Sequence, residues 1–224
     1  MKKAFPVMKT CPLFAGIAES DYENLLAALS AKEDFFPKNE TVIQIGDSGK
    51  RAGLVLSGVL EVSFYDENAA LVSVTRIEPG NVFGAMMLCA KVTDSPIHLR
   101  AVSDCTLLFL DFSRLLQNAA RQSTAETQLA ANLLGYFARR SFLLTQKIRI
   151  LGQKKLRDKL KLYFPTLPKQ KNGIRKLPLS KTELASFLYA DRSALSRELS
   201  RMQEEGIIAM DGKEIVILDP DFLD

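Results

Sequence analysis

The stretch Leu179–Gly206, LSKTELASFLYADRSALSRELSRMQEEG, organises the C-terminal part of this 224-residue chain. Its apolar spacing predicts two short helices joined by a tight turn, one over about residues 181–188 and one over about residues 191–205. Ser180 precedes the first helix and Glu183 follows three residues later, a capping-box pattern that marks where this helix begins. We therefore expect a closely packed pair of helices in this part of the chain.

The two predicted helices have an apolar and a polar face. Asp191 is a suitable N-cap for the second helix, and Gly206 is typical of a helix C-terminus. Apolar positions at helical spacing predict the packed face, namely Leu184, Ala185, Leu188, Leu195, Leu199 and Met202. The outward face of the second helix holds hydrogen-bond donors that can reach base edges and phosphates, namely Arg192, Ser193, Ser196, Arg197, Ser200 and Arg201. This arrangement is typical of a DNA-reading helix-turn-helix.

The segments around this motif are basic. Residues 1–146 hold 14 Lys and Arg against 15 Asp and Glu, whereas residues 147–218 hold 16 against 8. The excess favours a polyanionic partner for the C-terminal part, although a solvated basic face is the common alternative for a charge run. After the motif, GIIAMDGKEIVILD predicts a β-hairpin that turns at Asp211-Gly212, and a hairpin beside a helix-turn-helix is a wing.

The N-terminal part has a β pattern. A helix is expected over residues 13–30, and from about Asp34 to Phe112 short runs rich in Val, Ile and Phe alternate with turn signals. The predicted strand regions are Thr41–Ile45, Leu54–Tyr65 with Gly58 in its middle, Leu71–Ile77 and His98–Phe112. Several short strands at this spacing predict an antiparallel barrel or jelly roll. A barrel of this size either encloses one small molecule or is simply a packed core.

A long helix is predicted between these two parts, from about Thr124 to Leu151. At 1.5 Å per residue it is roughly 40 Å long. Its apolar positions at a spacing of three or four are Leu129, Leu133, Tyr136, Phe137, Leu143, Leu144, Ile148 and Leu151. They are more than one barrel face needs, so we expect a parallel homodimer through this helix. The alternative is a helix that packs wholly within its own chain.

The composition excludes several classes of protein. With 47% apolar residues the chain suits a globular fold, and no run approaches the ~18 apolar residues of a membrane span, so no membrane partner is expected. The basic N-terminus lacks the apolar region of a signal peptide. The three cysteines are widely spaced and odd in number, which makes a reducing cytoplasm the simplest context.

In its order of motifs the whole chain resembles the cAMP receptor protein and FNR family of bacterial transcription regulators. The matching segments are Pro12-Leu13-Phe14, Gly46-Asp47, Gly58, Pro79–Gly84, Leu99–Cys105 and Arg192–Ile208. The resemblance implies an α+β protein with a cyclic-nucleotide-binding-like β jelly-roll barrel over residues 1–122, a long dimerisation helix over 123–151 and a winged helix-turn-helix over 152–224. It also implies a cytoplasmic homodimer on a near-palindromic DNA operator, with RNA polymerase as a candidate partner.

Residue by residue, the resemblance places Arg192, Ser193 and Arg197 at the bases, with Ser196 beside them. It places Ser180, Lys181 and Thr182 at the phosphate backbone. Many family members have a glutamate at the position of Ser193, so we expect a different recognised sequence, because a serine lacks the carboxylate that accepts from cytosine N4. The turn also departs from the family pattern, with Tyr189-Ala190 where many helix-turn-helices have a glycine.

The effector pocket is where the resemblance weakens. Cyclic-nucleotide binders have a Gly-Glu pair and a later Arg-Ser or Arg-Thr, but here Gly84 is followed by Ala85, and the later pair falls on Ser95 and Pro96. A phosphate buried without a cation is costly, so we expect an effector other than cAMP. The candidate pocket residues are Phe83, Gly84, Ala85, Met86, Met87, Ser95, Arg100, Arg140 and Ser141.

Other functions remain open at this point. An iron–sulfur cluster is not expected, because it needs four Cys thiolates. Haem is not expected either, but a haem-dependent gas sensor with His98, the only histidine, as axial ligand stays an alternative. So does a constitutive DNA-binding protein whose barrel is only a dimerisation scaffold. Cys89 as a redox switch has no neighbouring base or cation to support it. An enzyme has no support, because the chain lacks a catalytic triad, a metal-ligand cluster and a P-loop.

Overall fold

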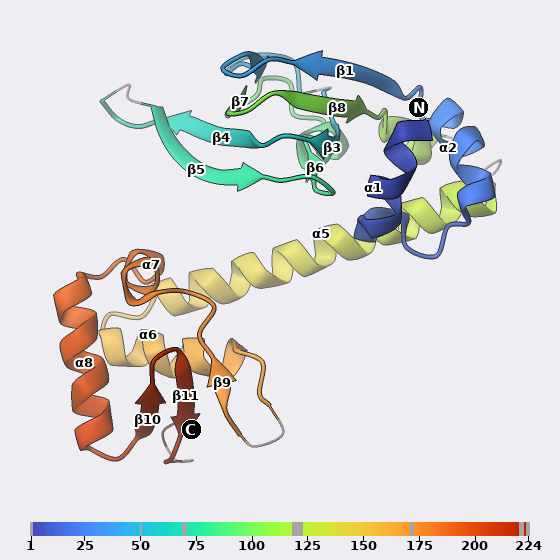
Figure 1. The fold of residues 1–224 in the computed structure, drawn as a ribbon. Coiled ribbons are helices and arrows are strands. Elements are labelled where there is room, and N and C mark those ends of the chain that lie inside the picture. The colour runs from blue at the N-terminus through green and yellow to red at the C-terminus, as the bar shows by residue number, and fades with distance from the viewer. Residues whose placement is uncertain are drawn as a thin grey trace. The chain divides into compact units, whose positions relative to one another are not determined.

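The computed structural model describes residues 2–49, 51–68, 71–117, 123–170, 173–219 and 222. The chain forms two compact units, Met1–Ala138 and Arg139–Asp224, and the division falls within the 28-residue helix α5, Thr124–Leu151 (Figure 1). The limits of α5 are those that the apolar spacing predicts. Residues 118–122, where the first predicted domain boundary falls, lie outside the described residues.

The N-terminal unit is built on two four-stranded antiparallel sheets (Figure 1). The first has the strand order β1 (Lys32–Phe36), β8 (Cys105–Phe109), β3 (Gly53–Ser57) and β6 (Val82–Phe83). The second has the order β2 (Thr41–Ile43), β7 (His98–Ala101), β4 (Leu60–Tyr65) and β5 (Leu71–Ile77). Their apolar side chains share one core, which includes Phe36, Val42, Val55, Leu60, Leu99 and Leu107. The predicted antiparallel β architecture is confirmed.

The run Leu54–Tyr65 forms two strands rather than one. Gly58, between β3 and β4, has φ +80°, in the left-handed region that only glycine adopts readily. A Cβ at this position would lie 2.2 Å from the carbonyl oxygen of Asp104, so no larger residue fits. The chain therefore turns at Gly58 and passes from the first sheet to the second.

Short helices cover one end of this unit, and they correct the helix predicted over residues 13–30. That segment contains two 3₁₀ turns, Pro12–Phe14 and Glu19–Asp21, and the helix α2, Tyr22–Ala28. The Asn132 side chain on α5 donates from Nδ2 to the carbonyl oxygens of Leu13 and Ala15, at 2.9 and 2.8 Å. These carbonyls therefore face α5. The helices α1 (Phe5–Thr10), α3 (Ala85–Cys89) and α4 (Ser113–Gln117) complete the unit.

The C-terminal unit packs helices against a small sheet. After the last turns of α5 come α6 (Leu156–Tyr163), the 3₁₀ turn Phe164–Thr166, α7 (Lys181–Phe187) and α8 (Arg192–Glu204). The antiparallel sheet has the order β10 (Ile208–Asp211), β11 (Glu214–Ile217) and β9 (Arg175–Lys176), so the predicted wing hairpin is confirmed. Its turn residues are Gly212-Lys213 rather than the predicted Asp211-Gly212, because Asp211 still pairs with Glu214. Among the described helices of both units, none is long and apolar enough to cross a membrane.

Candidate nucleic-acid interface and effector region

The first helix of the helix-turn-helix begins with the predicted capping box. The Glu183 backbone N–H donates to Ser180 Oγ at 3.2 Å, and the Ser180 backbone N–H donates to Glu183 Oε2 at 2.7 Å. The hydrogen bond from the Ser180 backbone N–H stabilises the carboxylate and is the main cause of a lowered pKa for Glu183. Lys181 and Thr182 are exposed in the first turn of α7. Asp191 occupies the N-cap position of α8, as predicted, although its side chain makes no capping hydrogen bond.

The helices α7 and α8 pack through the apolar face that the sequence predicts, and Leu184, Leu188 and Leu195 are fully buried. The small Ala185 is also buried at this contact. The turn between the helices passes through Tyr189, which has φ +50° and a side chain that is 78% exposed. A non-glycine residue in the left-handed region is strained by about 1–2 kcal/mol. The turn thus keeps the geometry that other helix-turn-helices obtain with glycine.

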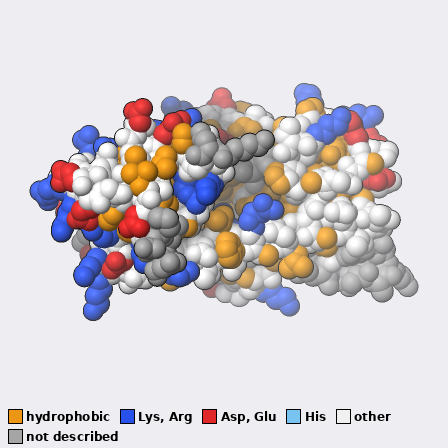
Figure 2. Space-filling model, turned by 90° about the horizontal axis from the view of Figure 1, so that it is seen from below, with side chains coloured by type: hydrophobic (Ala, Val, Ile, Leu, Met, Phe, Trp, Pro, Cys, Tyr) orange, Lys and Arg blue, Asp and Glu red, His pale blue; other side chains and the backbone are white. Residues whose placement is uncertain are grey.

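The opposite face of α8 presents two arginines without a partner in the described part of the chain. Arg192, Ser193 and Arg197 are exposed, and Ser196 is half-buried between them. Within the described part of the chain, neither Arg192 nor Arg197 forms an ion pair or a side-chain hydrogen bond. In the space-filling view, the surface formed by the C-terminal unit carries many Lys and Arg side chains (Figure 2). These guanidinium groups are therefore available to an external anion.

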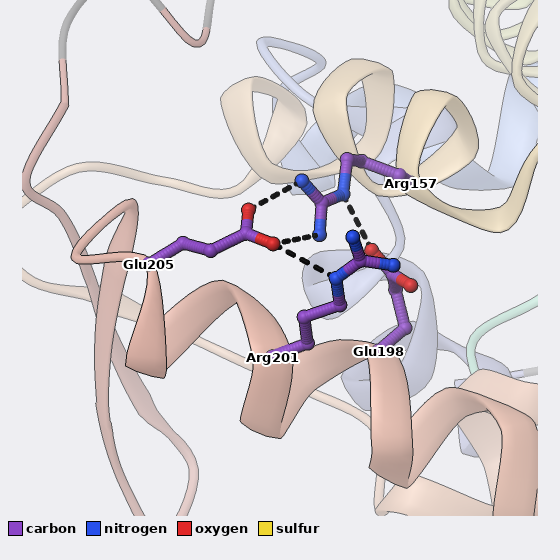
Figure 3. Close-up of polar contacts among 4 residues, drawn as sticks. All are labelled: Arg157, Glu198, Arg201 and Glu205. Carbon is purple, nitrogen blue, oxygen red and sulfur yellow. Dashed lines mark hydrogen bonds and ion pairs between the residues drawn. The ribbon is translucent and has the colours of Figure 1, made fainter.

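Arg201 differs from these two arginines, because it belongs to an ion-pair network that the sequence does not predict (Figure 3). Its Nε donates to Glu205 Oε1 at 2.8 Å. Arg157, on α6, donates from Nε to Glu198 Oε1 and from Nη1 to Glu205 Oε2, at 2.5 Å in both cases. The Arg157 hydrogen bond is the main cause of a lowered pKa for Glu205, and Arg201 adds to it. Through these ion pairs, Arg157 connects the C-terminal half of α8 to α6.

Local sequence contains one weak signal for this network. Glu198 and Glu205 are seven residues apart, so they lie on the same side of α8. Their partner lies 41 and 48 residues earlier in the chain, on a different helix. No pattern of spacing connects residues at such a distance.

The candidate effector region of the N-terminal unit is closely packed. Phe83 is buried and makes an edge-to-face contact with Phe109, with 5.5 Å between the ring centroids. Gly84 has φ +69°, and a Cβ there would lie 2.0 Å from the carbonyl oxygen of Arg51. Ala85 is buried at the start of α3, whereas Met86 is exposed. Gly84 is thus required by the backbone, and its neighbour Ala85 offers no polar group.

The polar candidates in this region are paired within the chain. Ser95 is 2% exposed; its Oγ donates to the Ile97 carbonyl oxygen at 2.9 Å and lies 3.7 Å from Met87 Sδ. The Arg100 guanidinium forms an ion pair with Glu61, at 3.3 Å between Nη2 and Oε1. Ser95 and Met87 therefore lie side by side, and the charge of Arg100 is neutralised by the Glu61 carboxylate. Arg140 and Ser141 belong to the C-terminal unit, where both are exposed.

The cysteines and the histidine have ordinary structural surroundings. Burial raises the pKa of the thiols of Cys11, Cys89 and Cys105, which lowers their thiolate fraction near neutral pH. His98 Nε2 lies 3.1 Å from Thr41 Oγ1. Within the described ranges, no group of three or more His, Cys, Asp or Glu side chains has the arrangement of a metal site.

Comparison with known proteins assigns a family description to each part. A cyclic nucleotide-binding domain matches residues 33–122, and a Crp-like helix-turn-helix domain matches residues 141–224. The cyclic AMP receptor protein of Thermus thermophilus is 26% identical over 209 residues, which are 91% of this chain and 90% of that protein.

Solved structures share the fold. The c-di-GMP-responsive global regulator CLP of Xanthomonas campestris matches 90% of this chain and all of its own, with a TM-score of 0.52 and 20% identity. The N-terminal domain of a transcriptional regulator from Streptomyces coelicolor matches 60% of this chain and 94% of its own, with a TM-score of 0.51 and 19% identity.

Proposed function

This chain belongs to the Crp/Fnr family of transcription regulators, and we propose that it binds a near-palindromic DNA operator as a homodimer under the control of a small effector other than cAMP. The observation that carries the proposal is the pair of guanidinium groups on the exposed face of α8, Arg192 and Arg197, which have no partner among the residues that the structure describes. An arginine in this position can donate two hydrogen bonds to guanine O6 and N7 in the major groove. Lys181 and Thr182 are proposed contacts to phosphates.

Dimerisation is supported by the surface of α5. Leu134 and Ile148 are 70% and 71% exposed, which is unusual for large aliphatic side chains. Ser141 lies midway between them, seven residues from each, so the three positions form one stripe with the heptad spacing of a coiled coil. A second copy of this stripe would bury both side chains and place two recognition helices on successive major grooves, about 34–36 Å apart.

An effector other than cAMP is supported by the packing of the barrel. Ala85 offers no acceptor for a ribose hydroxyl, and the one arginine among the candidates of this unit, Arg100, is already neutralised by Glu61. A cyclic phosphate near Ser95 would find no unpaired cation among the described candidate residues of this unit, and burying an unneutralised phosphate is costly. The same satisfied packing favours a second candidate function, a constitutive regulator whose barrel is only a scaffold.

Two measurements test these proposals. Fluorescence anisotropy with DNA selected from random sequence should give saturable, sequence-dependent binding whose affinity falls steeply with salt concentration. Binding that is independent of both salt and sequence would overturn the DNA-binding proposal. Native mass spectrometry of freshly purified protein then shows whether a small molecule is retained. The two candidates are separated by DNA affinity: an effector-gated regulator changes its affinity when a retained or added small molecule occupies the barrel, and a constitutive one does not.

A further inference from the structure

A cavity of about 750 Å³ lies within the C-terminal unit. Its wall comes from the last turns of α5, from α6 with the 3₁₀ turn that follows, and from Phe187 of α7. Leu143, Ile150, Leu162 and Tyr163 supply much of the apolar part of this wall. The volume is in the range of sites for small organic ligands, about 300–1,000 Å³.

The charged part of the wall has one sign. Four cations line the cavity, Arg140, Lys147, Arg149 and Lys161, and no Asp or Glu is among the lining residues. Within the described residues, none of the four forms an ion pair with a carboxylate. The Lys147 ammonium lies 4.9 Å from the centroid of the Phe187 ring, and both Lys147 and Lys161 are half-buried. Cations that are partly removed from water and lack a counter-ion favour an anion beside them.

Part of the cavity wall lies on a different side of α5 from the proposed dimer stripe. At about 100° of rotation per residue, Leu134 and Ile148 lie within about 40° of each other, whereas Leu143 lies about 140° from Ile148. Leu143, Lys147 and Ile150 are spaced as one helix face. A second copy seated on Leu134 and Ile148 would therefore leave the face of Leu143, Lys147 and Ile150 to another occupant. Leu144, which also lines the cavity, lies about 40° from Ile148 and is at the border of the two surfaces.

We infer that the cavity binds a small amphipathic anion. Its aliphatic or aromatic body packs against Leu143, Leu162 and Phe187, and its carboxylate or phosphate lies among the lysines and arginines of the wall. Because the wall joins α5 to the first helix of the helix-turn-helix, a bound ligand stabilises one arrangement of α7 against α5. This site is separate from the barrel, and it does not depend on what the barrel binds.

The test is a fluorescence titration of the full chain with cis-parinarate, a fatty acid whose emission rises in apolar surroundings. We expect saturable binding that decanoate or decyl phosphate displaces. Decanol, which has the same body without the charge, and acetate, which has the charge without the body, should each displace it at least about tenfold more weakly, because a hydrogen-bonded charge and an apolar body both contribute. Equal displacement by decanol and decanoate would overturn the inference, as would a signal that does not saturate.

Variants locate the site. The double variant Lys147→Met with Lys161→Met should weaken parinarate binding by about tenfold or more, and Lys154→Met, an exposed lysine outside the cavity, should leave it unchanged. Circular dichroism melting of all variants checks that they remain folded, and Leu143→Gln tests the apolar wall independently. Equal parinarate binding by the double variant and by the control would overturn the assignment. So would the release of bound probe when the protein concentration is raised until the dimer forms.

Discussion

Arg157 of α6 and Glu198 of α8 form an ion pair with 2.5 Å between Nε and Oε1, and their side chains are 28% and 20% exposed. The same guanidinium donates to both oxygens of Glu205, seven residues further along α8 (Figure 3). A planar guanidinium that donates to two carboxylates constrains both the position and the rotation of α8. The orientation of the proposed recognition face is therefore set by contacts on the opposite side of the helix.

Replacing Arg157 by methionine should destabilise the protein by about 1–3 kcal/mol, because the partly buried Glu198 loses its ion-pair partner and Glu205 keeps only Arg201. Urea unfolding of the full chain, monitored by circular dichroism, measures this change. Lys154→Met removes a nearby exposed charge without touching the network and should have little effect. Unfolding midpoints that agree for both variants would show that the network contributes nothing to stability.

Acidification should remove the stability that the carboxylates of the C-terminal unit contribute. The pKa values of Glu205 and Glu183 lie below the ordinary value of 4.5, so the folded state binds protons less tightly than the unfolded state. Their contribution is complete above that value and is lost as the pH falls from 4.5 through the folded-state pKa. Unfolding free energies measured across this range should fall more steeply for the native chain than for Glu205→Gln. The same slope in both proteins would contradict the prediction.

Arg197→Ala should lose about 1–3 kcal/mol of affinity on the preferred operator and relax the sequence preference at one base pair. Anisotropy titrations against the operator and its single-base variants measure both effects. Arg201→Ala is the matched control. Because Arg201 is already paired with Glu205, its replacement should reduce the operator affinity less than Arg197→Ala does. A loss that is the same on all sequences would assign Arg197 to a phosphate instead of a base.

Tyr189→Gly should stabilise the protein, because glycine relieves the strain of φ +50° and the exposed ring loses few contacts. The greater entropy of glycine in the unfolded chain limits the gain to about 1 kcal/mol. This gain corresponds to a rise of about 2–4 °C in Tm. Differential scanning calorimetry measures this, with Tyr189→Ala as the variant that keeps a Cβ and should gain nothing. An unchanged Tm for the glycine variant would mean that the turn is not strained.

Replacing both Leu134 and Ile148 by glutamate should convert the proposed dimer to a monomer, because it places charges in the apolar seam. Sedimentation velocity over a range of protein concentrations measures the oligomeric state. Lys154→Glu introduces a negative charge beyond the end of α5 and should leave the dimer intact. If the double variant sediments as the native chain does, the dimer uses another surface.

Local sequence patterns were sufficient wherever a structural element is determined by residues a few positions apart. Such elements are the limits of α5, the capping box of Ser180 and Glu183, the buried face of α7 and α8 and the wing hairpin. All of them depend on spacing within a few residues, and the structure has each of them, with the hairpin turn one residue later than predicted. The edge strand Lys32–Phe36 is not among the predicted strands, because its first residues are charged and exposed and so lack the alternation of a half-buried strand.

Only the tertiary structure could determine the contacts that cross the chain. Asn132 donates to the carbonyls of Leu13 and Ala15, more than a hundred residues earlier, in a segment where local spacing favours a helix. Likewise, Arg157 meets Glu198, and Lys147 meets Phe187, only because packing of the apolar faces brings their helices together. Helix periodicity indicates which side of each helix is buried. It does not indicate which distant charged or aromatic side chain that helix will contact, because this depends on how all the buried faces pack together.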